Sequence, residues 1–329
     1  MIGHTGLRQL PTRRIPVSYK VIANTKDLSR EDWLKMRKDY IGGSDASAVC
    51  GLNPWRSVLD VWMEKKATEI QDNPSYKMIL GNKLEQTVAE LFEEKTGKKV
   101  RRNNQMMVSE EHPFMLADID REIVGEEAIL ECKTTSGWNR DQWKDGVVPI
   151  WYQLQVQHYM AVTGASLAYV ACMIGFEDFV IREVKRDEET IDLLIDFEKK
   201  FYEGLKDPEW MPEPDGSSAY TEALRLKYSR SIANDDPVAL QMDISPYFAL
   251  EEEIKELTER KERMAQKMMK ALGEAETGES KDAFVTWKSV TSNRFDSKSF
   301  RKDHPDLYEQ YKKESTSRRF KVTKKEERK

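Results

Sequence analysis

The 329-residue chain is predicted to have an α/β (α+β) fold, in which a mixed β-sheet is flanked by helices and followed by a helical, coiled-coil extension. Three observations predict this class. Two pairs of apolar-rich runs are each divided by a short polar turn, as in β-hairpins. Segments around them carry apolar residues at helical spacing. A heptad pattern follows a stretch rich in Pro, Gly, Ser and Asp.

The N-terminal part of the chain is predicted to consist of a lead-in and short helices. Residues 1–28 show no sustained periodicity, and a helix begins near Ser29, where a capping serine precedes acidic residues. Residues 41–45 (IGGSD) predict either a tight turn into a helix N-terminus that can hold a phosphate, or an ordinary capped helix. The NPW sequence at 53–55 ends that helix, and another is predicted over 57–66.

An amphipathic helix is predicted over 81–96, because its apolar residues form one stripe and Gly97 ends it. Glu85 adjoins this stripe near the start of the helix and could face inward, although charges of this kind usually lie on a solvated face. A strand through Met107 and a turn at 110–113 are predicted to follow. These elements lead into a central hairpin.

The central hairpin, predicted over 119–133, carries the residues that suggest chemistry. Side chains alternate between the faces of a strand, so Glu131 and Lys133 point to one side, and Asp120 on the preceding strand can converge on the same patch. Asp118 offers another carboxylate on the strand face of Asp120. Two carboxylates and an ammonium suit a hard cation such as Mg²⁺ that holds a scissile phosphate. An alternating Glu-x-Lys pair is also common on surface strands.

A helix over 151–163 carries Gln153 and Gln157 four residues apart, and hence on one face. These amides could hydrogen-bond a phosphate, orient a ligand or water beside a metal, or bond within the core. A second hairpin over 166–185 and a helix over 188–204 complete the predicted α/β core.

Residues 208–244 are predicted to be a linker, and residues 245–329 a module with a heptad helix, a small strand and helix, and a basic tail. The heptad seam could pair with another chain or fold back on its own. It comprises Leu250, Ile254, Leu257, Lys261, Met264, Met268 and Ala271. The tail from Lys312 carries nine Lys/Arg against three Glu, which is consistent with phosphate contact or with a solvated tail.

Composition limits the classes of protein to which the chain can belong. No apolar run approaches the roughly 18 residues of a membrane span, and the N-terminus has no signal-peptide core, so a cytoplasmic protein is predicted. Cys50, Cys132 and Cys172 are widely spaced, which disfavours a disulfide framework, a four-cysteine cluster and an iron–sulfur nuclease. The net charge of −5 argues against nonspecific coating of nucleic acid.

Four blocks in fixed order together resemble the YqaJ viral recombinase family of phage-type nucleases. This family includes relatives of phage lambda exonuclease and has the PD-(D/E)xK motif. The resemblance covers residues 33–202. The blocks are Arg37-x3-Ile41-Gly-Gly-Ser44-Asp-Ala, Gly81-x3-Glu85 with Phe92 and Thr96-Gly97, Asp120…Glu131-x-Lys133, and Gln153-x-Gln155-x-Gln157 followed by Val162-Thr163-Gly164.

The resemblance implies a nuclease domain over 29–207 with a restriction-endonuclease-like core, which hydrolyses DNA with Mg²⁺ or, as a substitute, Mn²⁺. It implies a 5′-to-3′ exonuclease that acts on the ends of linear double-stranded DNA and generates single strands for a single-strand annealing protein. It also implies a homo-oligomer in the form of a trimeric ring, and a phage or prophage protein in a bacterial host.

The resemblance further assigns roles to the residues of the central hairpin. Asp120 and Glu131 correspond to the Mg²⁺ ligands, with the backbone carbonyl of Cys132 as a further ligand. Lys133 corresponds to the residue that positions or polarises the attacking water and stabilises charge on the phosphorane. Where lambda exonuclease has a second metal-ligating aspartate, counting back from Asp120 reaches Glu110, whose longer side chain leaves a second metal open.

Other matched residues surround this hairpin in the resemblance. Glu85 corresponds to the helical acid of the family, and Gln157 to the glutamine that borders the site. Arg37 and Ser44 match positions that grip the DNA end, the arginine as a charge-assisted phosphate ligand. Gln153 is a candidate phosphate-binding residue, because it shares a helix face with Gln157.

Two alternatives remain open. The first is an endonuclease with the same metal site, because the catalytic residues do not distinguish the two modes of cleavage. The second is a non-catalytic protein that binds DNA ends or a partner, in which the coiled-coil seam and the basic tail carry the function. The joint presence of Asp120, Glu131 and Lys133 argues against the second.

Overall fold

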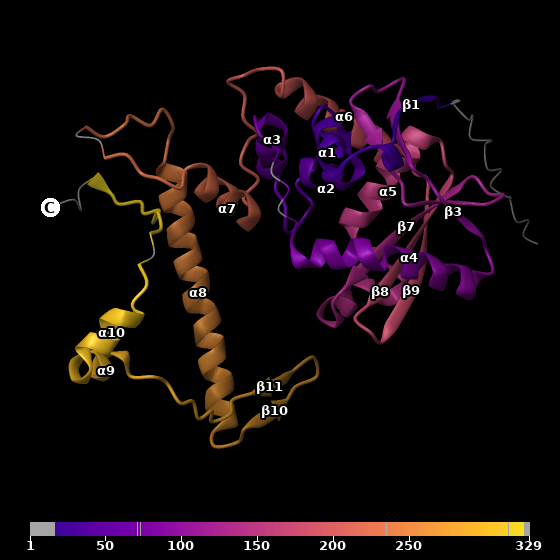
Figure 1. The fold of residues 1–329 in the computed structure, drawn as a ribbon. Helices are drawn as coiled ribbons and strands as arrows, with labels where there is room; N and C mark the ends of the chain where they lie inside the picture. The colour runs from indigo at the N-terminus through magenta and orange to yellow at the C-terminus, as the bar shows by residue number, and fades with distance from the viewer. Residues whose placement is uncertain (1–16, 71, 73, 234–235, 315, 326–329) are drawn as a thin grey trace, which may run out of the picture. The chain divides into compact units, whose positions relative to one another are not determined.

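The fold is shown in Figure 1. The computed structural model describes most of the chain, namely residues 17–70, 72, 74–233, 236–314 and 316–325. Residues 1–16 of the predicted lead-in therefore lie outside the described residues. The chain divides into two compact units, Met1–Ser229 and Arg230–Lys329, and the division falls within the stretch 208–244. Each unit is described separately below.

The first unit is built around a five-stranded sheet with the order β3-β6-β7-β8-β9. Its strands are β3 (Val100–Arg102), β6 (Arg121–Ile123), β7 (Ala128–Thr135), β8 (Leu167–Ile174) and β9 (Asp178–Lys185). β7 and β8 are parallel, whereas the other neighbours are antiparallel. Parallel neighbours need a crossover, which here contains α5 (Ile150–Thr163), ended by Gly164 in the left-handed conformation. The predicted mixed sheet is confirmed.

A second, four-stranded sheet has the order β1-β4-β5-β2. Its strands are β1 (Tyr19–Asn24), β4 (Gln105–Ser109), β5 (Met115–Ala117) and β2 (Ile41–Gly42). β5 ends at Ala117 and β6 begins at Arg121, so Asp118–Asp120 connects the two sheets. The first strand of the hairpin predicted over 119–133 is consequently short, Arg121–Ile123, because the chain passes from one sheet to the other at this point.

Different helices cover the two faces of the main sheet. α4 (Tyr76–Thr96) contributes Phe92 to a cluster that contains Leu130 of β7. α5 contributes Val156 to a second cluster that contains Ile129 of β7. Because Ile129 and Leu130 are successive residues of a strand, they lie on opposite faces. The sheet flanked by helices is thus as predicted.

Further helices complete the first unit. They are η1 (Thr25–Asp27), α1 (Arg30–Lys38), α2 (Gly43–Val49), α3 (Val58–Lys66), η2 (Gly137–Gly146), α6 (Glu188–Gly204) and α7 (Ser218–Lys227). α7 lies within the stretch 208–244. Its Tyr220 is buried with Leu59 of α3, and the Tyr220 hydroxyl donates to the Pro212 carbonyl at 2.5 Å. Burial of this ring explains why a helix forms in a stretch rich in Pro, Gly and Ser.

The second unit consists of one long helix, a hairpin and two short helices. They are α8 (Ser245–Leu272), β10 (Thr277–Glu279), β11 (Phe284–Thr286), α9 (Ser297–Asp303) and α10 (Pro305–Tyr311). The ring of Phe320 in the basic tail lies 6.4 Å from that of Tyr247, near the start of α8. Within the described ranges, no helix combines the length and the apolar character that crossing a membrane requires.

Candidate active site

The structure brings Asp120 and Glu131 together where the two sheets meet. In the β6–β7 hairpin Arg121 faces Leu130, and Asp120 and Glu131 are the next residues in this register. The backbone N–H of Cys132 donates a 2.8 Å hydrogen bond to Asp120 Oδ2, which draws the aspartate onto β7. Glu131 is only 4% exposed. The two carboxylates are therefore neighbours in a buried setting.

Glu131 and Lys133 share the face of β7 that packs against α5, as strand alternation predicts. Lys133 Nζ donates to Glu131 Oε1 at 2.6 Å and lies 4.9 Å from the centre of the Tyr152 ring. Gln155 Nε2 donates to the same Glu131 oxygen at 2.8 Å and to the Tyr159 hydroxyl at 3.1 Å. Helix α5 thus supplies an amide and two aromatic side chains to this cluster.

Burial dominates the electrostatics of these residues. Desolvation, followed by the negative charge of Glu131, holds the pKa of Asp120 well above its usual value. Burial also raises the pKa of Glu131, although the ammonium of Lys133 opposes this shift. Burial lowers the pKa of Lys133, but the carboxylates of Glu131 and Asp120 outweigh it, so this pKa is raised. One ammonium does not compensate two buried carboxylates, and the cluster attracts further positive charge.

Asp120 and Glu131 could therefore hold a divalent metal ion. Mg²⁺ is commonly bound through one or two carboxylates, with waters and substrate phosphates as its other ligands. Two neighbouring carboxylates with raised pKa values, one buried and one partly buried, fit this requirement. In the part of the chain that the structure describes, no group of three or more His, Cys, Asp or Glu side chains could hold an ion. Backbone carbonyl, water or phosphate oxygens would complete the coordination.

Asp118 is a further carboxylate near this pair, whereas Glu110 is not brought to it. Trp33 Nε1 donates to Asp118 Oδ2 at 2.7 Å, and burial raises the pKa of Asp118. The charge of Asp118 in turn contributes to the raised pKa of Glu131. Glu110 is exposed, and its N–H donates to the Ser18 carbonyl. The reason is the antiparallel β4–β5 pairing, which carries Glu110 away from the end of β5.

Glu85 faces inward from α4 and pairs with two arginines of the main sheet. Its Oε1 accepts hydrogen bonds from Arg121 Nη1 at 2.6 Å and from Arg102 Nη2 at 3.2 Å. Its negative charge contributes to raising the pKa of both Asp120 and Glu131. The structure thus brings Glu85 within electrostatic reach of the two carboxylates.

The glutamine that contacts the Glu131 carboxylate is Gln155, not Gln157 or Gln153. Gln157 Nε2 donates to the Lys185 carbonyl at 2.7 Å, and its Oε1 accepts from the Asp187 N–H at 3.1 Å. Gln153 Nε2 donates to a backbone carbonyl of the preceding loop. Two residues along an α-helix correspond to a turn of about 200°, so Gln155 points away from both. Gln157 instead fastens α5 to the end of β9.

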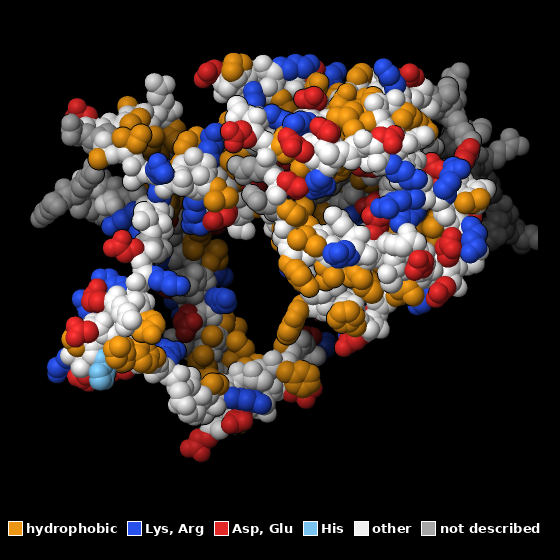
Figure 2. Space-filling view, viewed as in Figure 1, with side chains coloured by type: hydrophobic (Ala, Val, Ile, Leu, Met, Phe, Trp, Pro, Cys, Tyr) orange, Lys and Arg blue, Asp and Glu red, His pale blue; other side chains and the backbone are white. Residues whose placement is uncertain are grey.

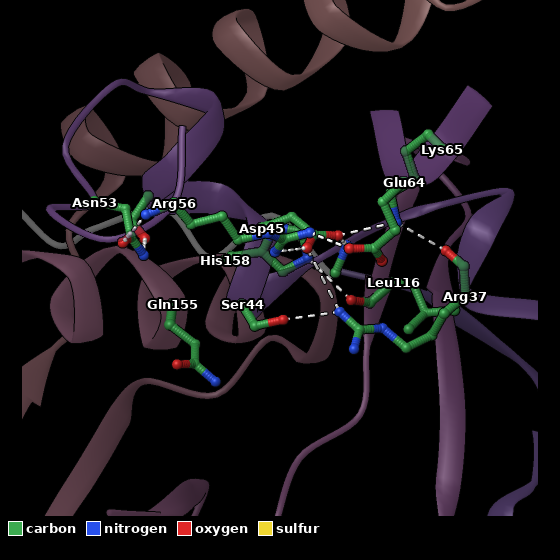
Figure 3. Close-up of polar contacts among 12 residues, drawn as sticks. Arg37, Ser44, Asp45, Asn53, Arg56, Glu64, Lys65, Leu116, Gln155 and His158 are labelled. Atoms are coloured by element: carbon green, nitrogen blue, oxygen red, sulfur yellow. Dashed lines mark hydrogen bonds and ion pairs between the residues drawn. The ribbon is translucent and has the colours of Figure 1, made fainter. Parts of the chain in front are cut away.

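A second polar network joins Arg37 and Ser44 (Figure 3). Arg37 Nη2 donates to Ser44 Oγ at 2.8 Å. Asp45 is fully buried beside them, with Arg56 Nη1 at 2.6 Å, Lys65 Nζ at 3.0 Å and Arg37 Nη2 at 3.7 Å from its oxygens. Burial raises the pKa of Asp45, but these three cations outweigh it and hold the pKa well below its usual value. The structure therefore brings Arg37 and Ser44 together in a cationic setting.

The IGGSD turn is capped by its aspartate. Asp45 Oδ2 accepts a 3.1 Å hydrogen bond from the Gly42 N–H, which leaves the Ser44 hydroxyl facing Arg37. The half-exposed Glu64 pairs with Arg56 at 2.5 Å. Three cations thus surround Asp45, and the charge of Arg56 is further balanced by Glu64 and Asp60.

Trp33 connects the two networks. The guanidinium carbon of Arg37 lies 4.8 Å from the centre of the Trp33 ring, and that of Arg30 lies 4.5 Å from it. The Trp33 N–H is bonded to Asp118, as described above. Helix α1 therefore contributes to both networks, and a stacked guanidinium and an indole hydrogen bond join them.

A buried pair of His158 and Glu198, which sequence analysis did not predict, holds α5 in place. His158 Nδ1 lies 2.8 Å from Glu198 Oε1, and Nε2 lies 3.0 Å from the Leu116 carbonyl. Burial lowers the pKa of His158, but Glu198 outweighs it, so the pKa is raised. The pair ties α5 to α6 and to β5. The partners of His158 are 40 and 42 residues away in the chain, so no local sequence pattern predicts these contacts.

Comparison with known proteins identifies similar chains. Residues 32–166 match the family model of the YqaJ-like viral recombinase domain. The chain is 39% identical over 307 residues to the "Uncharacterized protein YqaJ" of Bacillus subtilis (strain 168). This similarity covers 92% of the present chain and 96% of the Bacillus protein.

Solved structures give more distant matches. The alkaline exonuclease LHK-Exo of Laribacter hongkongensis is 18% identical, with a TM-score of 0.45 over 60% of this chain and 97% of that chain. A phage related exonuclease of Haemophilus somnus 129PT is 14% identical, with a TM-score of 0.39 over 53% of this chain and 98% of that chain.

Proposed function

This chain belongs to the YqaJ-like viral recombinase family, and on this premise we propose that it is a divalent-metal-dependent nuclease acting on DNA. The observation that carries the proposal is the pair formed by the buried Glu131 and the partly buried Asp120, with Lys133 beside it. A phosphodiester is anionic, and its hydrolysis concentrates negative charge on the phosphoryl oxygens. Two carboxylates beside a fixed ammonium suit this reaction once a cation is bound.

In this proposal Asp120, Glu131 and the backbone carbonyl of Cys132 would hold Mg²⁺, for which Mn²⁺ could substitute. When bound there, the ion would supply Lewis-acid stabilisation of the phosphate and would lower the pKa of a bound water. Lys133 adds a fixed positive charge beside the phosphate and positions the attacking water. Its contacts with Glu131 and Tyr152 hold the ammonium in place.

Two helices support the carboxylates in this reading. Gln155 fixes the Glu131 carboxylate through its amide, and its own orientation is held by the Tyr159 hydroxyl. Glu85 adds negative charge near the metal position, while Arg121 compensates part of that charge. A preorganised arrangement of this kind stabilises the transition state without reorganisation during the reaction.

We further infer that Arg37 and Ser44 bind the terminal 5′ phosphate of duplex DNA. The partly exposed Arg37 is held beside the Ser44 hydroxyl, and guanidinium groups form strong, charge-assisted hydrogen bonds with phosphate. The enzyme would then be a 5′-to-3′ exonuclease on linear double-stranded DNA, in the cytoplasm of a bacterial host. It would supply single strands to an annealing protein, with a trimeric ring as the assembly that encloses the duplex.

The proposal is tested with linear duplex DNA that carries a 5′ phosphate at one end only, incubated with Mg²⁺ beside a covalently closed circle. Loss of the linear DNA alone, faster from the phosphorylated end, is the expected result. Cleavage of the circle would identify an endonuclease with the same metal site. Failure to cleave either DNA with Mg²⁺ or Mn²⁺ would leave a non-catalytic protein that binds DNA ends.

A further inference from the structure

The apolar seam of α8 is exposed over most of its length, from Leu250 to Met268. None of the 28 residues of this helix is buried. Figure 2 shows hydrophobic side chains along it. The exposed fractions are 40% for Tyr247, 56% for Leu250, 62% for Ile254, 51% for Leu257, 57% for Met264 and 44% for Met268. Most of the stability of an amphipathic helix comes from packing its apolar face, so a partner for this seam is expected.

The seam follows the heptad repeat of a coiled coil. Tyr247, Ile254, Lys261 and Met268 take the a positions, and Leu250, Leu257, Met264 and Ala271 take the d positions. Lys261 is the one charged residue among them. In a parallel pair of identical helices, two Lys261 side chains would meet in one layer and repel. In an antiparallel pair a residues pack beside d residues, and Lys261 lies beside Leu257 of the partner subunit.

The two halves of α8 carry opposite charges. Residues 250–257 contain four Glu and one Lys, whereas residues 258–272 contain five Lys or Arg and two Glu. The ion pairs formed within the helix involve residues of its outer face, such as Glu252 with Lys255. An antiparallel pair brings each acidic half against a basic half, whereas a parallel pair brings like charges together.

We propose that α8 pairs in antiparallel orientation with the α8 of a second copy of this chain. Ile254 then packs beside Met264 of the partner subunit, and each of the two central layers contains one Leu257 and one Lys261 from opposite subunits. In this alignment Glu253 lies opposite Lys267 of the partner subunit, and symmetry gives two such ion pairs. Both are g positions, which flank the seam and determine orientation in coiled coils.

The test measures self-association of the full chain by sedimentation velocity over a range of concentrations. The variants are Glu253→Lys and Lys267→Glu, each alone, and an equimolar mixture of the two. Glu252→Lys is the matched control, because it makes the same charge change one residue away on the outer face. Any assembly of the nuclease unit is common to all samples, so differences between them report on α8.

Each single variant is expected to pair about tenfold more weakly than wild type, because two attractions become repulsions. The mixture should regain wild-type affinity, since a chain with lysine at both of these g positions then meets a chain with glutamate at both. A misfolded variant could not show this recovery, and Glu252→Lys should behave as wild type. The proposal is overturned if mixing gives no recovery, if Glu252→Lys weakens pairing equally, or if wild type does not associate through α8. The first outcome would indicate parallel pairing, and the second a nonspecific effect of charge on association. The third would indicate that another segment or another protein covers the seam.

Discussion

The backbone N–H of Cys132 donates a 2.8 Å hydrogen bond to Asp120 Oδ2, so the strand that carries Glu131 and Lys133 also holds the aspartate. The pair of carboxylates is thus maintained by the main chain of β7 rather than by a flexible contact. This relationship makes it possible to remove the charge of Asp120 while retaining its position. Asn at this site keeps an oxygen that can accept from Cys132.

Asp120→Asn and Lys133→Ala are expected to separate metal binding from turnover. Lys133→Ala should retain the rise in Tm that Mg²⁺ or Mn²⁺ produces but lose about 10²–10³-fold in cleavage rate, because a preorganised charge is removed. Asp120→Asn should lose both the metal-induced rise in Tm and the activity. Thermal unfolding with and without metal, beside assays on linear duplex DNA, measures both effects. A wild-type cleavage rate for either variant would refute the assigned site.

Gln155 and Gln157 form a matched pair on one helix. Gln155→Leu removes the amide that holds Glu131, and we expect a decrease of about tenfold or more in kcat with a small change in stability. Gln157→Leu leaves the Lys185 carbonyl and the Asp187 N–H without their partner, which should lower the free energy of unfolding by about 1–3 kcal/mol. Urea unfolding measures the stability of both variants, and steady-state kinetics measures their kcat. If Gln157→Leu lowered kcat and Gln155→Leu lowered stability instead, Gln157 would be the active-site residue.

Arg37 and Arg30 provide a control pair for end recognition, since both guanidinium groups lie over the Trp33 ring. Only Arg37 is bonded to Ser44. Arg37→Ala should abolish the preference for a 5′-phosphorylated end, whereas Arg30→Ala should retain it. The ratio of degradation rates from phosphorylated and unphosphorylated ends measures the preference. If the two variants retain the same ratio as wild type, the phosphate is bound elsewhere.

Asp45 is expected to stabilise the fold in a pH-dependent manner. Its folded-state pKa is depressed, so its contribution is complete above its usual value of 3.8 and is lost as the pH falls toward the lower pKa. At pH 7, Asp45→Asn should lower the free energy of unfolding by about 3–5 kcal/mol, because Arg56 and Lys65 lose their buried counter-charge.

Below about pH 4 the difference between Asp45→Asn and wild type should narrow, because Asp45 then binds a proton in the unfolded chain while it stays ionised in the folded protein. Chemical unfolding of both proteins at several pH values tests whether this difference in the free energy of unfolding decreases as the pH falls. Glu64→Gln is the control, since Glu64 is half exposed and its pair with Arg56 should contribute less than about 1 kcal/mol. A pH-independent difference for Asp45→Asn would show that lost packing, not lost charge, causes the effect.

The family and the α/β class could be predicted from the sequence, and both are confirmed. Strand alternation correctly placed Glu131 and Lys133 on one face, because a period of two follows from strand geometry alone. The contact of Asp120 with β7 depends on hairpin register, which the short turn between the strands restricts.

Other features depend on how distant elements are rotated against each other. The sequence pattern of α5 does not show which face of the helix meets β7. From spacing alone, Gln155 and Gln157 are therefore equally plausible as the residue that contacts Glu131. One signal was available: Gln155 and Tyr159 are four residues apart, and together they offer an amide and a hydroxyl on one face. The position of Glu110 depends on the antiparallel direction of β4 relative to β5. Counting residues back from Asp120 along the sequence does not take this direction into account.

Trp33 joins Arg37 to the acidic segment that precedes β6. Arg37 and Trp33 are one helical turn apart on α1, and the indole N–H is bonded to the acidic segment that leads to Asp120. A strand end anchored at Arg37 would therefore always present the same bond to the carboxylates. The geometry of α1 would then determine the length of the released fragment. A substitution that repacks Trp33 would change this length more than it changed the rate of hydrolysis.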